Sequence, residues 1–340
     1  MRGRGLKVVL RADASVSQGS GHVMRCLTLA EELQARNHEV HLVGVPSGIG
    51  WLEAAIASNV DEFHRCEPNG LDVDTIKGIG PDWVVVDSYL VESAQISRLN
   101  SFIPVLAIVD GDIRGIDSSL YLEQNLGSEH KSWRIPQSSE MLAGSSFALV
   151  RDAILEQRRP QAWRMDAVPR LVAFMGGTDP TGAIVKVASQ LAKIAQPISL
   201  TVIAPEIRHT EIELLLSQIN RVQVITPTPD LPALLGHADI AISAAGTSAW
   251  DICSLGLPSV FIALVENQRE SLREVMRDEL ALGLDLVLEG ESALGRLPLF
   301  VDRLLEDALL RQSLSQRSLG MFDGRGKGRV VDAMEQFERG

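Results

Sequence analysis

The sequence predicts an α/β protein built from two doubly wound, parallel-sheet domains. Short runs of β-branched and apolar residues alternate with longer segments of helical period, a pattern typical of a parallel sheet covered by helices on both faces. The alternation starts again after a hydrophilic stretch at 156–166. A chain of 340 residues is also long enough for about two ordinary domains.

The expected strands follow the short apolar runs. In the first half they lie at 6–11, 40–43, 83–87, 105–110 and, more weakly, 120–122. In the second half they lie at 171–175, 200–204, 222–225, 240–243, 260–264 and 284–288. Helical segments separate them; one is 23–36, where Val23, Leu27, Ala30 and Leu33 recur at steps of three and four residues.

These elements assign 1–158 to a first domain and 168–320 to a second, with 156–166 as the linker. Residues 321–340 are predicted to form a C-terminal helix, with return to the first domain as one possibility and a flexible turn expected at the glycine-rich run 324–328. Ligands of doubly wound sheets bind beyond the carboxyl ends of the strands. The crevice between the two halves is therefore the expected site.

Composition narrows the class of protein. The 44 acidic residues outnumber the 32 Lys and Arg, giving a net charge of −12, which argues against a general nucleic-acid or anionic-membrane binder. The three cysteines, Cys26, Cys66 and Cys253, have neither metal-ligand spacing nor the even number of a disulfide framework. The amino terminus lacks the long apolar run of a signal peptide, and no stretch is long enough to span a bilayer. We expect a soluble, cytoplasmic protein with no membrane insertion.

The most informative segment joins the first strand to the first helix. Its loop carries Gly19 and Gly21, and the helix begins near His22. Glycines let the backbone approach a ligand, and the free N–H groups of a first helical turn attract anionic oxygen. An imidazole at this position can act as a general base. A histidine that only caps the turn is the alternative, but the coincidence of glycine loop, strand end and helix start favours function.

Several common nucleotide and hydrolase motifs are absent. A dinucleotide fingerprint needs a third glycine where Met24 stands, and no acidic residue ends the second strand. The sequence also has no Walker lysine pattern, no His-Glu-x-x-His and no Gly-x-Ser-x-Gly. These absences argue against a dehydrogenase, a P-loop NTPase, a zinc protease and an α/β-hydrolase.

Acidic residues follow two further strands of the first half. Asp87-Ser-Tyr89 ends one strand and Asp110-Gly-Asp112 ends the next. Acids at such places can bind sugar hydroxyls or orient a histidine, but they also serve as turn and cap residues. We favour function for Asp87 and Tyr89 and a structural role for Asp112.

The second half has three small or polar junctions between a strand and a helix. The first is Gly176-Gly177-Thr178-Asp179-Pro180, a plausible diphosphate cradle in which Asp179 would be the N-cap and Pro180 the first helical residue. The second runs from Ser243 to Asp251, with Thr247 or Ser248 as cap and Ser248 with Asp251 as a capping box. The third holds Asn267 and Gln268. Each junction alone is weak evidence for a ligand site, because a tight turn between a strand and a helix would explain it. Together the three junctions favour a nucleotide diphosphate site.

These motifs coincide with those of a known family. The segment 11–30, Arg-Ala-Asp-Ala-Ser followed by Gly-Ser-Gly-His-Val-Met-Arg-Cys-Leu-Thr-Leu-Ala, resembles the opening of pseudaminic acid pathway hydrolases, and related spore-coat polysaccharide proteins share it. The likeness continues in order through Val-Asp-Ser-Tyr at 86–89, Phe-Ala-Leu-Val-Arg at 147–151, Met-Gly-Gly-Thr-Asp at 175–179, Ile-Ser-Ala-Ala-Gly at 242–246 and Asn-Gln at 267–268. It spans most of the chain.

The resemblance implies the GT-B architecture, two Rossmann-like domains as in many inverting glycosyltransferases. It implies release of UDP from a UDP-linked 2,4-diacetamido-2,4,6-trideoxy sugar, by cleavage of the anomeric C–O bond without metal or other cofactor. By position, His22 would activate water, and Asp13 and Tyr89 would line the sugar side of the catalytic centre. UDP would be held by Gly176, Gly177, Thr178, Ser243, Ala245, Gly246, Thr247, Asn267 and Gln268. Further substrate contacts are expected from Arg11, Gly19, Gly21, Asp87 and Asn125.

The sequence departs from the family on the sugar side. Relatives often carry a paired-acid motif where this chain has Asp110-Gly-Asp112, and a Leu-Leu-Asn-type segment where it has Leu-Glu-Gln-Asn at 122–125. About 50 residues at the end also extend beyond the compact members. Two alternatives therefore stay open: a glycosyltransferase with the same UDP-sugar donor and a sugar or lipid acceptor, and a non-catalytic nucleotide-sugar binding module.

Overall fold

The computed structural model describes residues 5–67, 70–166 and 168–337. These residues form two compact units, and the chain passes from the first to the second at Leu149/Val150 and returns at Asp323/Gly324. The predicted linker at 156–166 lies in the second unit. Residues 1–4 of the predicted first domain, 167 of the interval before the second, and 338–340 of the predicted last helix lie outside the described residues.

The first unit is built on a seven-stranded sheet in which every pairing is parallel, with the order β5-β3-β1-β6-β7-β8-β9. Its strands are β1 (Lys7–Ala12), β3 (Glu39–Gly44), β5 (Glu62–Arg65), β6 (Trp83–Asp87), β7 (Val105–Ile108), β8 (Leu120–Glu123) and β9 (Glu140–Ala143). A small separate pair joins β2 (Ala14–Ser15) to β4 (Pro46–Ser47). The helices are α1 (Gly21–Ala35), α2 (Gly50–Asn59), α3 (Val73–Ile79), α4 (Ser93–Asn100) and α14 (Gly326–Gln336), with 3₁₀ turns at η1 (Ser128–His130) and η2 (Ser145–Phe147).

Two separate apolar layers cover the sheet of the first unit. One layer is formed by α1, α2 and α14 and includes Val23, Leu33, Ile56 and Val330. The other is formed by α3 and α4 with the alternate strand residues. Because both faces are covered, the central strands are mostly apolar, as in other parallel sheets. Full burial of a side chain such as Leu33 contributes about 1.5–3 kcal/mol.

The second unit repeats the plan with a six-stranded parallel sheet, order β12-β11-β10-β13-β14-β15. Its strands are β10 (Arg170–Phe174), β11 (Ser199–Ile203), β12 (Arg221–Ile225), β13 (Ile240–Ala244), β14 (Ser259–Ala263) and β15 (Leu282–Asp285). The helices are α5 (Asp152–Leu155), α6 (Ala183–Leu191), α7 (His209–Leu215), α8 (Leu231–His237), α9 (Ser248–Ser254), α10 (Glu266–Arg277), α11 (Leu286–Glu289), α12 (Leu297–Glu306) and α13 (Ala308–Met321), with 3₁₀ turns at η3 (Glu206–Arg208) and η4 (Glu291–Arg296). A core cluster joins α6, α7 and α12 to the sheet.

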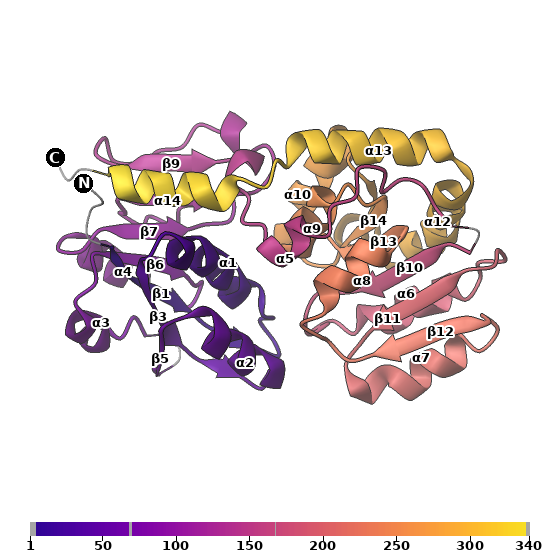
Figure 1. Ribbon diagram of the computed structural model, residues 1–340, viewed down its shortest axis with the longest axis horizontal. Helices are drawn as coiled ribbons and strands as arrows, with labels where there is room; N and C mark the ends of the chain where they lie inside the picture. Colours follow the sequence, from indigo (N-terminus) through magenta and orange to yellow (C-terminus); the bar gives the residue numbers. More distant parts are fainter. Residues whose placement is uncertain (1–4, 68–69, 167, 338–340) are drawn as a thin grey trace. The chain divides into compact units, whose positions relative to one another are not determined.

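The predicted fold class is confirmed, because both sheets are parallel and doubly wound (Figure 1). One expectation about a single element is wrong. The strand expected at 284–288 ends at Asp285, whose side chain accepts a hydrogen bond from the Leu288 N–H and so starts α11 instead.

None of the described helices combines the length and apolar character needed to cross a membrane.

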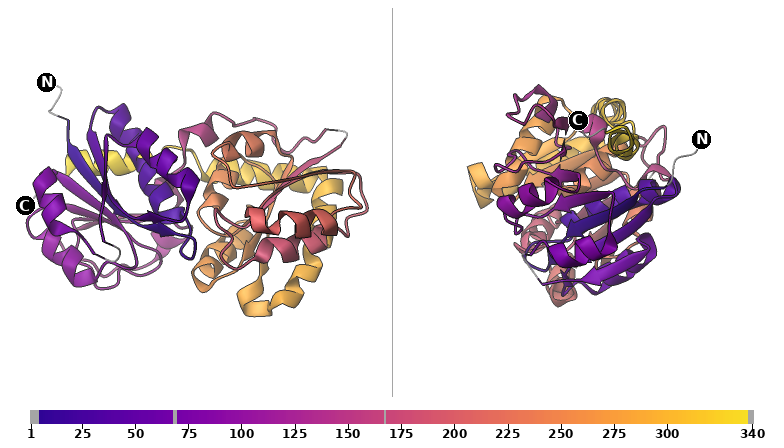
Figure 2. Two further views of the ribbon diagram at one scale, coloured as in Figure 1. Left: turned by 90° about the horizontal axis from the view of Figure 1, so that it is seen from below. Right: turned by 90° about the vertical axis from the view of Figure 1, so that its left-hand side faces the viewer.

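The last helix returns to the first unit, where α14 lies against α1 (Figures 1 and 2). The flexible turn expected at 324–328 is confined to its start, because Gly324 has φ +81° and the helix begins at Gly326. A Cβ at Gly326 would lie 2.1 Å from the Ala148 carbonyl oxygen, so glycine permits this close approach. The buried Lys327 ammonium pairs with Glu31 of α1 at 2.7 Å.

Candidate functional site

The order of the strands in the first unit places its candidate site. After β1 the chain adds β3 and β5 on one side of β1, and after them β6 to β9 on the other. Ligands of doubly wound sheets bind at the carboxyl ends of the strands, at the topological switch point where the order of strand addition reverses. In this sheet the switch point lies between β1 and β6. The helix that follows β1 carries His22 in its first turn, and β6 ends at Asp87.

His22 and Asp87 meet at this point. The Nδ1 atom of His22 lies 2.6 Å from Oδ1 of Asp87. A proton must lie between two atoms so close, so Nδ1–H donates, and in the neutral ring the lone pair is on Nε2. No residue in the described part of the chain hydrogen-bonds to Nε2 of His22. Since the side chain of His22 keeps 15% of its exposure, the free nitrogen is available to a ligand.

Arg25 fixes the carboxylate that orients His22. One helical turn after His22, its guanidinium donates to both oxygens of Asp87 at 2.7 and 2.8 Å. It also donates to both oxygens of Asp110 at 2.8 and 3.2 Å. Burial alone would lower the pKa of Arg25, but the charges of Asp110 and Asp87 outweigh burial and raise it well above its ordinary value. The guanidinium therefore locks two carboxylates in place by fork-like pairing.

Asp110 extends the network to Tyr89 and Asn125. The Tyr89 hydroxyl donates a short hydrogen bond to Asp110, and Asn125 Nδ2 donates to its other oxygen at 3.2 Å. Burial would raise the pKa of Asp110, but Arg25 and the Tyr89 hydroxyl hold it well below its ordinary value. Burial, together with the Asp110 charge, raises the pKa of Tyr89, which therefore remains a phenol. The Tyr89 ring also meets the His22 ring edge-on, with centroids 5.0 Å apart.

Behind this network, Glu123 ends β8 and is fully buried. It accepts a short hydrogen bond from the Gly111 N–H and another from the Asn125 N–H at 3.1 Å. Burial raises the pKa of Glu123 to about 7, with a further contribution from the charge of Asp110 and opposition from the two N–H groups. Glu123 thus holds the loops that position Asp110 and Asn125. Asp112, for which the sequence favours a structural role, accepts from the Arg114 N–H in a turn.

Arg11 and Asp13 form a pair of their own. Two nitrogens of the fully buried Arg11 donate to the two oxygens of Asp13 at 2.7 and 2.8 Å, and Asp13 also accepts from the Val45 N–H at 3.0 Å. No described hydrogen bond joins this pair to His22. In the following loop Gly19 has φ +84° and donates to the Ser15 carbonyl at 2.8 Å, while Gly21 opens α1. No described side chain caps the start of α1.

In the second unit, the three predicted loops follow neighbouring strands. The strands are β10, β13 and β14. Strands β11 and β12 are added on one side of β10, and β13 to β15 on the other, so the topological switch point lies between β10 and β13. Loop residues 176–178 follow β10, 245–247 follow β13, and 264–268 follow β14. The carboxyl ends of adjacent parallel strands share one edge of the sheet, so these loops lie side by side.

The glycine loop contains a buried hydroxyl without a partner among the described residues. Gly176 has φ +79°, and the buried Thr178 Oγ1 makes no hydrogen bond within the described chain. The expected cap geometry is wrong: α6 begins at Ala183 with Gly182 as N-cap, so Pro180 precedes the helix. Asp179 has φ +45° and reaches forward, and its carboxylate accepts from the N–H groups of Ala183 and Ile184 at 2.9 and 3.2 Å. Burial raises the pKa of Asp179.

The other two loops approach each other at Gly246 and Gln268. A Cβ at Gly246 would lie 3.6 Å from Nε2 of Gln268, and Oε1 of Gln268 accepts from the Leu264 N–H at 2.9 Å. Ser243 is fully buried and donates to the Ala244 carbonyl, and Ala245 is also buried. Asn267, in the first turn of α10, is exposed.

The capping box expected from Ser248 and Asp251 does not form. Thr247 is the N-cap of α9 but makes no side-chain cap bond. Asp251 pairs with Arg151 at 2.6 Å instead. Burial raises the pKa of Asp251 and Arg151 opposes that rise. The pair links α9 to the start of the second unit.

The sequence did not single out Arg25 and Glu123, and it treated Asp110 only as part of a motif. Arg25 could have been noticed because it lies three residues after His22 and so shares its helix face. The sign for Glu123 is an acid in the otherwise apolar strand β8. No local signal shows that Asp110 and Asp87 share one guanidinium, since they belong to different strand ends.

No protein-family model matches the chain. It is 23% identical over 298 residues to an uncharacterized protein of Methanocaldococcus jannaschii, covering 84% of this chain and 61% of that protein. It is 25% identical over 236 residues to the spore coat polysaccharide biosynthesis protein SpsG of Bacillus subtilis, covering 68% and 65%. It is 22% identical over 270 residues to the UDP-2,4-diacetamido-2,4,6-trideoxy-beta-L-altropyranose hydrolase of Campylobacter jejuni, covering 78% and 94%. The chain thus spans less than two thirds of the length of the first two relatives.

Solved structures resemble the chain over nearly all of its length. MurG of Acinetobacter baumannii superposes with a TM-score of 0.68 at 16% identity, covering 97% of this chain and 99% of that one. The spinosyn rhamnosyltransferase SpnG complexed with thymidine diphosphate gives 0.69 at 15%, covering 97% and 100%. The UDP-GlcNAc 2-epimerase of Neisseria meningitidis bound to UDP-GlcNAc gives 0.61 at 14%, covering 97% and 100%. The fold is GT-B. The two Rossmann-like units described above are the halves of that fold.

Proposed function

We propose that this chain is a hydrolase that releases UDP from a UDP-linked 2,4-diacetamido-2,4,6-trideoxy sugar, with His22 as the base that activates water. The observation that carries the proposal is the 2.6 Å contact between His22 Nδ1 and Asp87, which leaves Nε2 as an unpartnered acceptor. The distant likeness to the Campylobacter hydrolase and to the spore-coat protein supports the reaction and the substrate class. A role in polysaccharide or pseudaminic-acid-type biosynthesis in the cytoplasm is part of the same proposal.

In the proposed reaction, water forms a bond to the anomeric carbon while the bond from that carbon to the phosphate oxygen breaks. The electron pair leaves with UDP, and the water proton moves to Nε2 of His22. No metal or other cofactor takes part. The cluster of Arg25, Asp87 and Asp110 carries one net negative charge, so the imidazolium that forms brings the cluster to zero. Asp87 remains ionised and holds the ring, the role of an orienting carboxylate.

The remaining predicted residues take roles that fit their contacts. Tyr89 and Asn125, both bonded to Asp110, would line the sugar side beside His22. Arg11 and Asp13 would act as positioning residues, because their polar atoms hold the loop that leads to Gly19 and Gly21. Substrate contacts of Gly19 and Gly21 would be made through the backbone.

The second unit would hold UDP. Gly176, Gly177 and Thr178 would meet the diphosphate, and the unpartnered Thr178 hydroxyl supports this because a phosphate oxygen can accept its proton. The neighbouring loops would contribute Ser243, Ala245, Gly246, Thr247, Asn267 and Gln268. Backbone N–H groups and neutral donors there would stabilise the leaving diphosphate.

A glycosyltransferase is the second candidate, favoured by the GT-B fold shared with the rhamnosyltransferase SpnG. There His22 would take the proton of a sugar hydroxyl instead of water, and the UDP-sugar donor would sit in the same loops. The measurement that separates the two is whether UDP release needs an acceptor. UDP binding without turnover on any candidate sugar would instead favour a non-catalytic binding module.

The central experiment measures UDP release from the altrose-configured substrate by wild-type protein and His22→Ala. General base catalysis contributes about 10²–10⁴-fold, so the variant should lose that much in kcat. Its affinity for UDP, measured by calorimetry, should match wild type. In ¹⁸O-water the released UDP should contain no ¹⁸O, since the carbon–oxygen bond breaks. Full activity of His22→Ala, or ¹⁸O in UDP, would end this proposal.

A further inference from the structure

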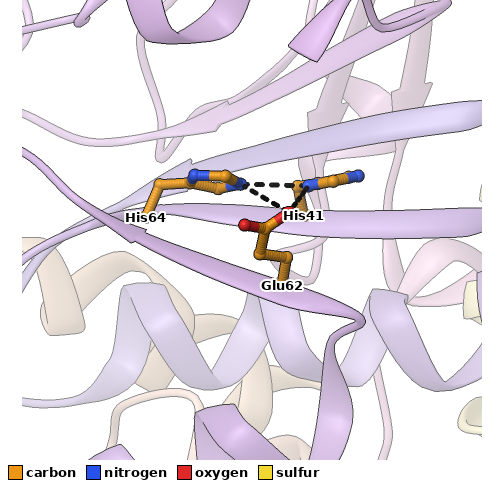
Figure 3. Close-up of side chains that lie close together, drawn as sticks. All are labelled: His41, Glu62 and His64. Carbon is orange, nitrogen blue, oxygen red and sulfur yellow. Dashed lines mark hydrogen bonds and ion pairs between the residues drawn. The ribbon is translucent and has the colours of Figure 1, made fainter.

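A second group of histidines lies in the first unit, away from His22. His41 is in β3, and Glu62 and His64 are in the neighbouring edge strand β5. His41 pairs directly with Glu62 in the parallel register, and residues two apart on a strand share one face. Figure 3 shows the three side chains pointing toward one another from these two strands.

The three facing atoms form a compact triangle. Nδ1 of His41 lies 3.0 Å from Nε2 of His64, and each nitrogen lies 3.6 Å from Oε2 of Glu62. Ligands bound tetrahedrally at about 2.0–2.1 Å would lie about 3.3–3.4 Å apart. The observed sides bracket that value, so a shift of a few tenths of an ångström would make the triangle one face of a coordination tetrahedron.

A second carboxylate orients His41. Oε1 of Glu39 lies 2.8 Å from Nε2 of His41, and Glu39 also pairs with Lys7 at 3.0 Å. With its Nε2 proton donated to Glu39, His41 has its lone pair on Nδ1, aimed into the triangle. Metal-binding histidines usually donate their other N–H to a carboxylate in this way. The buried His41 is therefore prearranged as a ligand, and His64 would join it by moving its proton from Nε2 to Nδ1.

The surroundings leave room and suitable charge for an ion. An open pocket of about 410 Å³, called the cavity below, lies beside the triangle and is lined also by Thr75 and Ile79. Glu39, Glu62 and Lys7 together carry one net negative charge, which a divalent cation would offset. The cavity gives a fourth ligand position to water or a small anion, as in sites with three protein ligands.

We propose that His41, Glu62 and His64 form a binding site for a divalent transition metal, with Zn²⁺ as the ion best suited to two imidazoles and a carboxylate. The bound ion would tie the edge strand β5 to β3 and keep one position open to the cavity. The site lies among residues near the start of β1, such as Lys7, and His22 follows the other end of that strand. It is independent of the proposed hydrolysis.

The test uses the full-length chain without an affinity tag, freed of metal by a chelator and titrated with Zn²⁺ by calorimetry. At about pH 8, where ordinary imidazoles are unprotonated, one Zn²⁺ should bind per chain. Glu39→Gln should weaken binding about 10–100-fold, the usual effect of losing such an outer partner. Glu62→Gln and His64→Gln should weaken it further. His130→Gln, which changes an exposed histidine of the same unit, is the matched control and should bind as wild type does.

Cobalt gives a second measurement that does not depend on affinity alone. Co²⁺ in the wild-type site should show the strong visible absorption of four-coordinate geometry, and His64→Gln should lose it while its far-UV circular dichroism stays unchanged. Absence of saturable Zn²⁺ binding, or unchanged binding and spectrum in His64→Gln, would overturn the proposal. Hydrolysis of the UDP-sugar, assayed in parallel with and without chelator, should be unaffected, so failure of either proposal is seen separately.

Discussion

The two units share a topology but carry different residues at the carboxyl ends of their strands. In the first unit the strand ends hold a buried ionic network, in which Arg25 joins Asp87 and Asp110 behind His22. In the second unit the matching ends hold glycines, hydroxyls and amides, and Thr178 is left without a partner. A doubly wound sheet thus supplies only the position; the loop residues decide whether that position moves protons or receives an anion.

The difference also predicts how each site should respond to substitution. A buried ionic network is interdependent, because removing one member leaves other charges without partners. Neutral loops with open hydrogen-bonding capacity lose a contact to the ligand but little of their own stability. Variants in the first network should therefore affect folding and function together, and changes to polar side chains of the second unit's loops should separate them.

The largest effect is expected from Arg25→Met. It leaves Asp87 and Asp110 buried without their cation, which should cost about 3–5 kcal/mol of unfolding free energy. Urea unfolding followed by circular dichroism measures this loss. Arg151→Met in the second unit removes the partner of a single carboxylate, Asp251, and should cost less. Equal losses in the two variants would contradict the interdependence of the first network.

Glu123→Gln should change how stability depends on pH. Below about pH 4.5 the carboxyl is protonated in both the folded and the unfolded chain, so it contributes no difference. Between that value and the folded pKa of about 7 only the folded form keeps its proton, so wild type loses stability as the pH rises. The variant lacks this loss, and the difference between the two should grow by about 3 kcal/mol across the interval.

Urea titrations of wild type and Glu123→Gln from about pH 4.5 to pH 8 measure that growth. A constant offset between the two proteins is expected in addition, because a Gln amide cannot accept from both Gly111 and Asn125. Parallel pH curves would show that Glu123 keeps an ordinary pKa.

Gly176→Ala should have a smaller effect on stability. Its φ of +79° is unfavourable for any residue with a Cβ, at about 1–2 kcal/mol, while the added atom meets nothing within 4 Å. Gly295→Ala is a suitable control, since that Cβ also meets open space and Gly295 is not among the positive-φ glycines. Thermal unfolding should show a loss only in Gly176→Ala, and calorimetry should show weaker UDP binding there.

The smallest effect on stability is expected from Thr178→Val. The hydroxyl has no partner among residues 5–67, 70–166 and 168–337, so its replacement by a methyl of similar shape should leave the unfolding free energy within about 0.5 kcal/mol. A hydrogen bond to a charged phosphate contributes about 1.5–3 kcal/mol, so UDP affinity should fall by about 10–100-fold. Thr178→Ser should keep the affinity. Equal UDP binding by all three proteins would remove Thr178 from the proposed cradle.

The sequence predicts the buried strands better than the edges. Central strands such as β1, β6, β10 and β13 are covered on both faces, so they appear as continuous apolar runs. Two strands of the seven-stranded sheet were missed, β5 and β9; they are its two edges, and their polar residues interrupt the pattern. The proposed metal site could not be predicted either, because Glu62 and His64 lie in the missed strand β5. Glu62 is also 21 positions from its register partner His41, so no local spacing indicates the site.

At the candidate site the sequence indicates where chemistry lies but not which residues hold it together. Glycines and polar residues after strands predicted that His22, Asp87 and Tyr89 would lie near one another, and their contacts are found in the structure. The sequence could not show that Asp251 pairs with Arg151, because that pairing depends on tertiary packing. Local capping rules failed at Pro180 and Ser248 for the same reason.

The return of α14 to the first unit has a consequence for synthesis on the ribosome. Val330, Val331 and Met334 belong to the same apolar cluster as Leu33 of α1, yet they are translated after the whole of the second unit. A nascent polypeptide that ends at residue 323 can fold its second unit while the first unit still exposes the apolar residues that α14 covers. The unit that carries His22 is therefore the last to complete its folding. A nascent chain stalled in that interval exposes apolar surface that chaperones can bind.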